Sequence, residues 1–133
     1  MRIIIGGAGR VGTELARALR AEEMDVVLMD FDSRAVKNAQ NLDVLVIHGD
    51  LTTRNKLNEA GIGEAEVFVA ATNSDERNLI ACAIAEHAHY EFGGPKAKPL
   101  LSLCRVRGMN FIQEQKQGHL TKWAKVNHAI NPL

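Results

Sequence analysis

Three glycines near the start of the chain have a spacing that suits phosphate binding. Gly7, Gly9 and Gly12 form a G-x-G-x-x-G pattern directly after the β-branched run Arg2 to Ile5. The first glycine allows a tight turn, the second lets the backbone approach a pyrophosphate, and the third lets a helix pack closely. The helix that follows offers unpaired N–H groups and the positive end of its dipole to the phosphates.

Asp30 stands at the sequence position expected for a carboxylate that accepts hydrogen bonds from ribose hydroxyls. It ends a second β-branched run, Val26 to Met29, and follows Gly12 at close to the typical spacing of about 20 residues. No arginine comes directly after Asp30, so a 2′-phosphate would meet an anion and NADP is disfavoured. Strand, glycines, helix, strand and acid together predict a nucleotide-binding βαβ unit, with a purely structural glycine turn as the alternative.

Composition sets limits on the class of protein. The chain has 133 residues, of which 46% are hydrophobic and 24% charged, with a net charge of zero. These values are typical of one globular domain and give no indication of nucleic-acid binding. We find no apolar run of membrane-spanning length and no signal peptide, so we expect a cytoplasmic domain that reaches a membrane only through a partner.

Cysteines and histidines give no sign of a disulfide framework or a metal site. Cys82 and Cys104 lack C-x-x-C spacing, which favours buried reduced thiols. His87 and His89 lie two residues apart on a predicted helix and therefore point to different sides. We expect hydrogen-bonded or solvated histidines and no metal ligands.

Short apolar runs alternate with helical patterns along the whole chain. Strands are predicted at residues 2–5, 26–29, 43–47, 67–71 and 100–106, with a weak sixth at 125–130. Continuous apolar strands indicate a parallel sheet covered on both faces. Right-handed crossovers then give an α/β, Rossmann-like doubly wound parallel sheet of strand order 3-2-1-4-5-6, a single domain over residues 1–133.

The predicted helices carry more detailed expectations. Asp32 or Ser33 can cap the second helix, and Asn73 with Glu76 has the form of a capping box for the fourth. One side of that fourth helix carries Leu79, Ile80, Ala83, Ile84 and His87. We expect residues 88–99 to be a loop or a frayed helix end, and residues 110–117 to form a polar helix.

The residues at the carboxyl ends of these strands define a candidate site. Ligands of such sheets bind where the strand order reverses, here between the first and fourth strands. Thr72 and Ser74 face this crevice, and the cationic Arg10 and Arg105 are candidates to bind phosphates. Two sets of alternatives stay open: Asp50 and Thr52 cap the third helix or contact adenosine, and Asp75 and Asn78 are helix-start residues or ligands.

Six short motifs together resemble the N-terminal domain of the regulators of potassium conductance, also called KTN or TrkA-N domains. The segments lie at residues 7–12, 27–32, 48–52, 71–78, 105–107 and 131–132, in the family's order. They are similar to its phosphate loop, its V-I-D-x-D strand end, and its G-D-x-T, A-T-x-S-D-E-x-N, A-R-V-R and N-P motifs. Cys104 stands where the A-R-V-R motif has its alanine.

The resemblance implies a cytoplasmic regulatory domain that binds a nucleotide and gates a potassium channel or transporter. It favours NAD(H), with ATP, ADP or AMP as alternatives, and assembly into a homodimer or higher ring, peripheral to the inner membrane through its partner. The expected cofactor-binding residues are Gly7, Gly9, Arg10, Val11, Gly12, Asp30, Asp32, Asp50, Leu51, Thr72, Asn73, Ser74 and Arg105.

The alternative function is that of an NAD-dependent dehydrogenase fragment without its catalytic domain. A dehydrogenase needs a proton-transfer group that faces the nicotinamide. No histidine or lysine follows the fourth strand, where Thr72, Asn73 and Ser74 stand instead. We therefore expect no catalytic residue and no enzyme activity.

Overall fold

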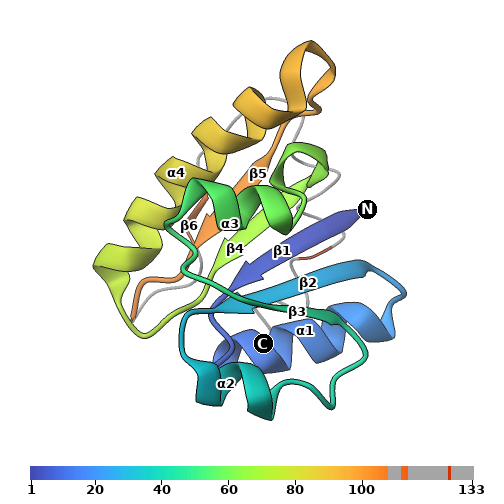
Figure 1. Ribbon diagram of the computed structural model, residues 1–133, viewed down its shortest axis with the longest axis vertical. Coiled ribbons are helices and arrows are strands. Elements are labelled where there is room, and N and C mark those ends of the chain that lie inside the picture. Colours follow the sequence, from blue (N-terminus) through green and yellow to red (C-terminus); the bar gives the residue numbers. More distant parts are fainter. Residues whose placement is uncertain (108–111, 114–125, 127–133) are drawn as a thin grey trace.

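A parallel β-sheet is the centre of the molecule. The computed structural model describes residues 1–107, 112–113 and 126. The strands are β1 (Arg2–Gly6), β2 (Asp25–Asp30), β3 (Leu45–His48), β4 (Val67–Ala70), β5 (Leu101–Cys104) and β6 (Ile112–Gln113). They lie in the order β3-β2-β1-β4-β5-β6, and β1 to β5 are parallel, so their carboxyl ends meet at one end of the sheet (Figure 1). This arrangement confirms the predicted Rossmann-like fold class.

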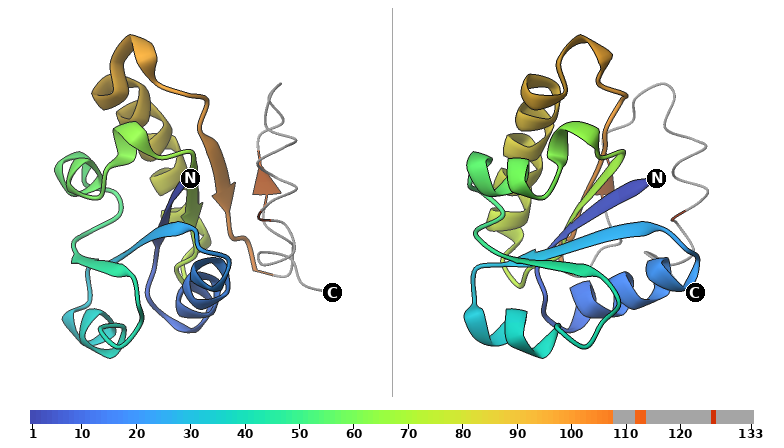
Figure 2. Two further views of the ribbon diagram at one scale, coloured as in Figure 1. Left: turned by 90° about the vertical axis from the view of Figure 1, so that its right-hand side faces the viewer. Right: turned by 45° about the vertical axis from the view of Figure 1, so that its right-hand side comes forward.

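Helices cover both faces of the sheet. They are α1 (Arg10–Ala21), α2 (Ser33–Asn38), α3 (Arg54–Glu59) and α4 (Asp75–Gly93), with 3₁₀ turns η1 (Ile62–Glu64) and η2 (Gly94–Lys96). Figure 2 shows α1 on one side of the sheet and α3 with α4 on the other. Alternate residues of β1 enter the two cores, since Ile3 and Ile5 pack on the α1 side and Ile4 on the α4 side.

The side of α4 that packs on the sheet differs from the expectation. Leu79 and Ile80 are each 54% exposed, whereas Ala81, Ala85 and Ala88 are buried. Small side chains allow the helix axis to approach the sheet, so the alanine stripe packs inward, Ile84 packs partly against the same core, and Leu79 and Ile80 remain outside. The cap also differs, because the side chain of Ser74, and not that of Asn73, accepts the Arg77 amide.

The structure decides two expectations near the end of the chain. Residues 88–93 are part of α4, which runs to Gly93 before the turn η2, so the helix-end alternative holds there and the loop alternative does not. The helix expected at residues 110–117 is contradicted at Ile112–Gln113, which pair antiparallel with β5 as β6. The sixth strand expected at residues 125–130 lies outside the described residues apart from Val126, which is helical and buried.

His89 connects α4 to η1 and to the segment before β5 through hydrogen bonds of its ring. The ring is fully buried, with Nδ1 2.6 Å from the carbonyl oxygen of Ile62 and Nε2 2.5 Å from that of Lys98. The histidine thus joins α4 to η1 and to the segment that leads into β5. His87 is exposed, with Nδ1 3.6 Å from the Glu91 carboxylate, so the two residues are a hydrogen-bonded and a solvent-facing histidine.

Candidate functional site

The glycine loop between β1 and α1 is packed closely at two of its three glycines. Gly7 has a φ of 115°, and an added Cβ would come within 2.9 Å of the Ala71 backbone. At Gly12 the added Cβ would lie 1.6 Å from the carbonyl oxygen of Gly7. The loop therefore folds back against the first turn of α1 and against the end of β4. Both glycines are required by the fold itself.

Gly9 is different, because nothing among the described residues lies within 4 Å of an added Cβ. It is the N-cap of α1 and has no side chain that could bond to the first amides of the helix. The Arg10 side chain is 91% exposed and lies 3.6 Å from Glu14 as a loose ion pair. Open space and free helix amides at one point fit a phosphate group.

Asp30 faces this loop from the end of β2. Its Oδ2 accepts a hydrogen bond of 2.8 Å from the Ala8 amide, and its Oδ1 accepts one of 2.8 Å from the Asp32 amide. Each carboxylate oxygen keeps a further lone pair for a hydroxyl group. Asp32 caps α2 by accepting the Arg34 amide at 2.9 Å. The carboxylate of Asp30 is therefore fixed in place beside the glycine loop.

Buried Asn78 holds the turn between β4 and α4. Its Oδ1 accepts hydrogen bonds from the Thr72 amide at 2.9 Å and the Thr72 hydroxyl at 2.6 Å. Its Nδ2 donates to the carbonyl of Thr72 at 3.1 Å and to that of Arg105 at 2.9 Å. Of the two alternatives for Asn78, this geometry favours a structural role. Arg105 also donates to the Thr72 carbonyl, at 3.3 Å.

One crevice of about 780 Å³ joins these segments. Ten of the predicted residues line it, namely Gly7, Gly9, Arg10, Val11, Asp30, Asp32, Thr72, Asn73, Ser74 and Arg105. Gly12, Asp50 and Leu51 do not line it. Leu51 is fully buried beneath Gly6, and Gly12 packs on the loop. Five further residues that the sequence motifs did not indicate as cofactor-binding also line the crevice, namely Glu14, Phe31, Ala35, Ala71 and Arg77.

Arg77, which lines the crevice, forms an ion pair with Asp50, which does not line it. Its Nη2 donates to Asp50 Oδ1 at 2.7 Å, and the same oxygen accepts the Thr52 amide and hydroxyl, both at 2.8 Å. Burial raises the pKa of Asp50, but the two Thr52 hydrogen bonds and the Arg77 guanidinium outweigh it and lower the pKa below its ordinary value. The carboxylate therefore keeps its charge until the pH falls through that lowered pKa.

A sequence signal for Arg77 did exist. A cation in the first turn of a helix opposes the local dipole and is therefore a candidate ligand for an anion, and Arg77 shares this position with Arg10. Phe31 stands between Asp30 and Asp32, directly after the predicted ribose carboxylate. Its exposure could not be read from the sequence.

The residues that form the glycine-loop crevice lie in a stretch of sequence that matches a known family. The profile of the TrkA-N domain matches residues 3–96, more than half of the chain. The chain belongs to the TrkA-N family. It is 32% identical over 133 residues to the Trk system potassium uptake protein TrkA of Haemophilus influenzae, and 36% identical over 118 residues to a TrkA homolog of Pyrococcus abyssi.

These TrkA relatives are longer proteins. The match spans 99% of this TrkA-N chain but 27% of the Haemophilus protein, and 88% of this chain but 50% of the Pyrococcus protein. Solved structures support the fold. The TrkA-N domain of inner membrane protein ybaL from Escherichia coli matches with a TM-score of 0.60 and 18% identity, over 65% of this chain and 64% of that one.

An NAD-bound enzyme also has a fold similar to this TrkA-N domain. The UDP-glucose 4-epimerase of Thermus thermophilus, in complex with NAD, matches with a TM-score of 0.56 and 16% identity. The match covers 70% of this chain and 35% of the epimerase. At this identity the comparison establishes the fold alone.

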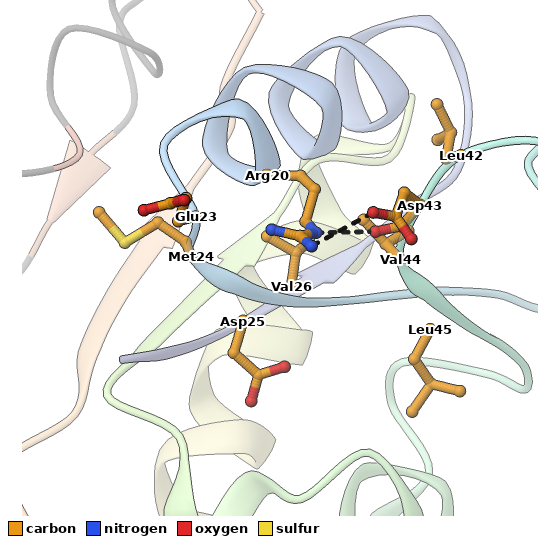
Figure 3. A pocket seen from close by; sticks show the side chains of 9 residues that line it. All are labelled: Arg20, Glu23, Met24, Asp25, Val26, Leu42, Asp43, Val44 and Leu45. Carbon is orange, nitrogen blue, oxygen red and sulfur yellow. Dashed lines mark hydrogen bonds and ion pairs between the residues drawn. The ribbon is translucent and has the colours of Figure 1, made fainter.

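A second hollow of this TrkA-N domain, of about 460 Å³, lies at the opposite end of β2. Arg20 points across it toward Asp43, as Figure 3 shows, with Nε donating to the Asp43 carbonyl at 3.0 Å and Nη2 3.2 Å from its carboxylate. The pair joins α1 to the segment that precedes β3. Because the glycine loop and Asp30 lie at the other end of the sheet, this hollow is no part of the glycine-loop crevice.

Within the described part of the TrkA-N chain, no cluster of three or more histidine, cysteine, aspartate or glutamate side chains could hold a metal ion. No described helix is long and apolar enough to cross a membrane. Cys82 and Cys104 are free thiols.

Proposed function

We propose that this TrkA-N domain binds an adenine nucleotide in the glycine-loop crevice and thereby regulates a membrane potassium channel or transporter. NAD(H) is the preferred ligand, with ATP, ADP or AMP as alternatives. The observation that carries the proposal is the open space at Gly9 beside the fixed carboxylate of Asp30. Phosphates at Gly9 and the α1 amides would leave the ribose hydroxyls facing Asp30.

The partner is proposed from the relatives' names, which describe potassium uptake proteins of Trk systems. We propose a cytoplasmic domain that meets the membrane through this transport protein. Self-association into a homodimer or ring is part of the same proposal. It is supported by the apolar side chains of Leu79 and Ile80, which are exposed on the outer side of α4.

The domain is proposed to sense the nucleotide without catalysing a reaction. Each of the three carboxylates that line the crevice has a partner: Asp30 accepts two backbone amides, Asp32 caps α2, and Glu14 forms a loose ion pair with Arg10. Histidine and lysine are absent from the described lining residues. The crevice thus offers donors for phosphates and acceptors for ribose, and little that could transfer a proton to a substrate.

The direct test is to identify the ligand that the protein retains. We expect native mass spectrometry of gently purified protein to detect NAD(H) or an adenosine phosphate, and titration of ligand-free protein to show saturable binding. NADH should not be oxidised with small carbonyl substrates. Steady turnover above a control without protein, lost in Gly9→Val, would instead support the dehydrogenase alternative. Protein that neither retains nor binds any nucleotide would refute the proposal.

Neutralising Arg10 should reduce the discrimination between ligands of different phosphate charge. We expect Arg10→Gln to weaken ATP binding by roughly two- to fivefold, since exposed ion pairs contribute up to about 1 kcal/mol. NADH and ADP should lose less affinity, so the three ligands should differ less in affinity and in their effect on assembly, read by titration and light scattering. Arg20→Gln, at the other end of α1, is the matched control. Unchanged preferences in Arg10→Gln would contradict this role.

A further inference from the structure

An exposed aromatic ring lies at the edge of the nucleotide crevice. Phe31 is 59% exposed and lines the crevice, although it directly follows the core strand β2. Its backbone carbonyl is 2.8 Å from His48 Nε2 at the end of β3, which fixes the segment that carries the ring. A large aromatic side chain held at the surface is available to a ligand.

The guanidinium of Arg77 supports this ring from the first turn of α4. The guanidinium carbon lies over the Phe31 ring, 5.2 Å from its centroid, a cation–π geometry. Asp50 holds the same guanidinium by the ion pair of 2.7 Å, and Thr52 in turn holds Asp50. The ring, the cation and the carboxylate therefore form one connected unit across β2, β3 and α4.

The arrangement does not satisfy all of the polar groups of Arg77. Its Nε is buried and has no hydrogen-bond partner among the described residues. A buried N–H without a partner is unfavourable, and such groups are rare in native structures, so each one needs a physical explanation. Because the position of Arg77 over Phe31 leaves this N–H unsatisfied, we take the pair to have a role in ligand binding and not only in fold stability.

The covalent structure of a nucleotide also places its base next to Phe31. With phosphates at Gly9 and ribose hydroxyls at Asp30, the base leaves the ribose on the side away from the phosphates. Phe31 directly follows Asp30 in the chain, and it is the aromatic residue among the described residues that line the crevice. Asp50 does not line the crevice, and three donors already occupy its Oδ1. The unit therefore presents the face of a ring to the base.

We propose that the base of the bound nucleotide stacks on Phe31, that Arg77 supports the ring, and that Asp50 is a positioning residue behind them. This inference rests on the proposed nucleotide binding and specifies its base-recognition element. It assigns affinity for the base to stacking on a cation-supported ring. Stacking of one base on an aromatic side chain corresponds to at least about a fivefold difference in affinity.

The test compares ADP with inorganic pyrophosphate, which has no base. In Phe31→Ala, ADP should bind at least about fivefold more weakly while pyrophosphate binding stays unchanged. Phe31→Tyr should restore ADP binding. Arg77→Lys keeps the charge but loses the planar group, so it should weaken ADP binding and leave pyrophosphate binding unaffected.

The chain supplies a matched control for this experiment. Phe92, at the far end of α4, has Arg54 over its ring at 5.8 Å from the centroid and lies outside the crevice. Phe92→Ala should therefore leave ADP affinity unchanged, and thermal unfolding should show that each variant is folded. ADP binding by Phe31→Ala at the parent's affinity would overturn the stacking proposal alone. If the parent binds neither ADP nor NADH, ATP or AMP, the proposed function is refuted as well.

Discussion

Gly12→Ala should prevent the domain from folding stably. The new methyl carbon would lie 1.6 Å from the carbonyl oxygen of Gly7 and 2.8 Å from its carbonyl carbon. Both are backbone atoms of a loop that is also packed against Ala71, so neither can move without displacing the end of β4. We expect a loss of about 3 kcal/mol or more in the free energy of unfolding, the upper range for overpacking.

Gly9→Ala is the control for this prediction. It makes the same chemical change three residues earlier, where nothing among the described residues lies within 4 Å of the new carbon. Urea unfolding should place Gly9→Ala within about 1 kcal/mol of the parent, since the new methyl group meets no atom and the remaining cost is that alanine is a poorer N-cap than glycine. Its nucleotide affinity should nevertheless fall, because the methyl group occupies the space proposed for the pyrophosphate. Equal stability of Gly12→Ala and the parent would contradict the close packing.

Asp30→Ala should lower the affinity for NADH and ADP by at least about tenfold. Hydrogen bonds to a charged acceptor contribute about 1.5–3 kcal/mol, and each 1.4 kcal/mol is a factor of ten. The carboxylate also holds the amides of Ala8 and Asp32, so its removal loosens the loop that carries the phosphate site. Isothermal titration of ligand-free protein measures the loss.

Two variants distinguish ribose binding from a general loss of structure. Asp25→Ala removes an acid from the opposite end of the same strand, where it pairs with Arg2 at the surface, and should leave affinity unchanged. Asp30→Asn keeps one carbonyl oxygen for hydrogen bonding and should bind with intermediate affinity. If Asp30→Ala binds NADH and ADP as tightly as the parent, the assignment of Asp30 to the ribose is wrong.

The sequence by itself determined the order of the sheet and the position of the crevice. Continuous apolar strands with helices between them have few ways to bury both faces, and the right-handed crossover selects one strand order. Gly7, Gly9 and Asp30 could be chosen because turn geometry and strand register act over short stretches of chain. For the same reason the cap of α2 could be limited to Asp32 or Ser33, of which the structure has Asp32.

Only the tertiary structure decided which residues share a surface. Periodicity marked Leu79 and Ile80 as apolar, but close approach of α4 to the sheet required the alanines to face inward. Leu51 belongs to a motif next to the site, yet it packs in the core beneath Gly6. The contact of Arg77 with Phe31 and Asp50 joins three segments far apart in the chain, and such contacts depend on side-chain packing that no local pattern encodes.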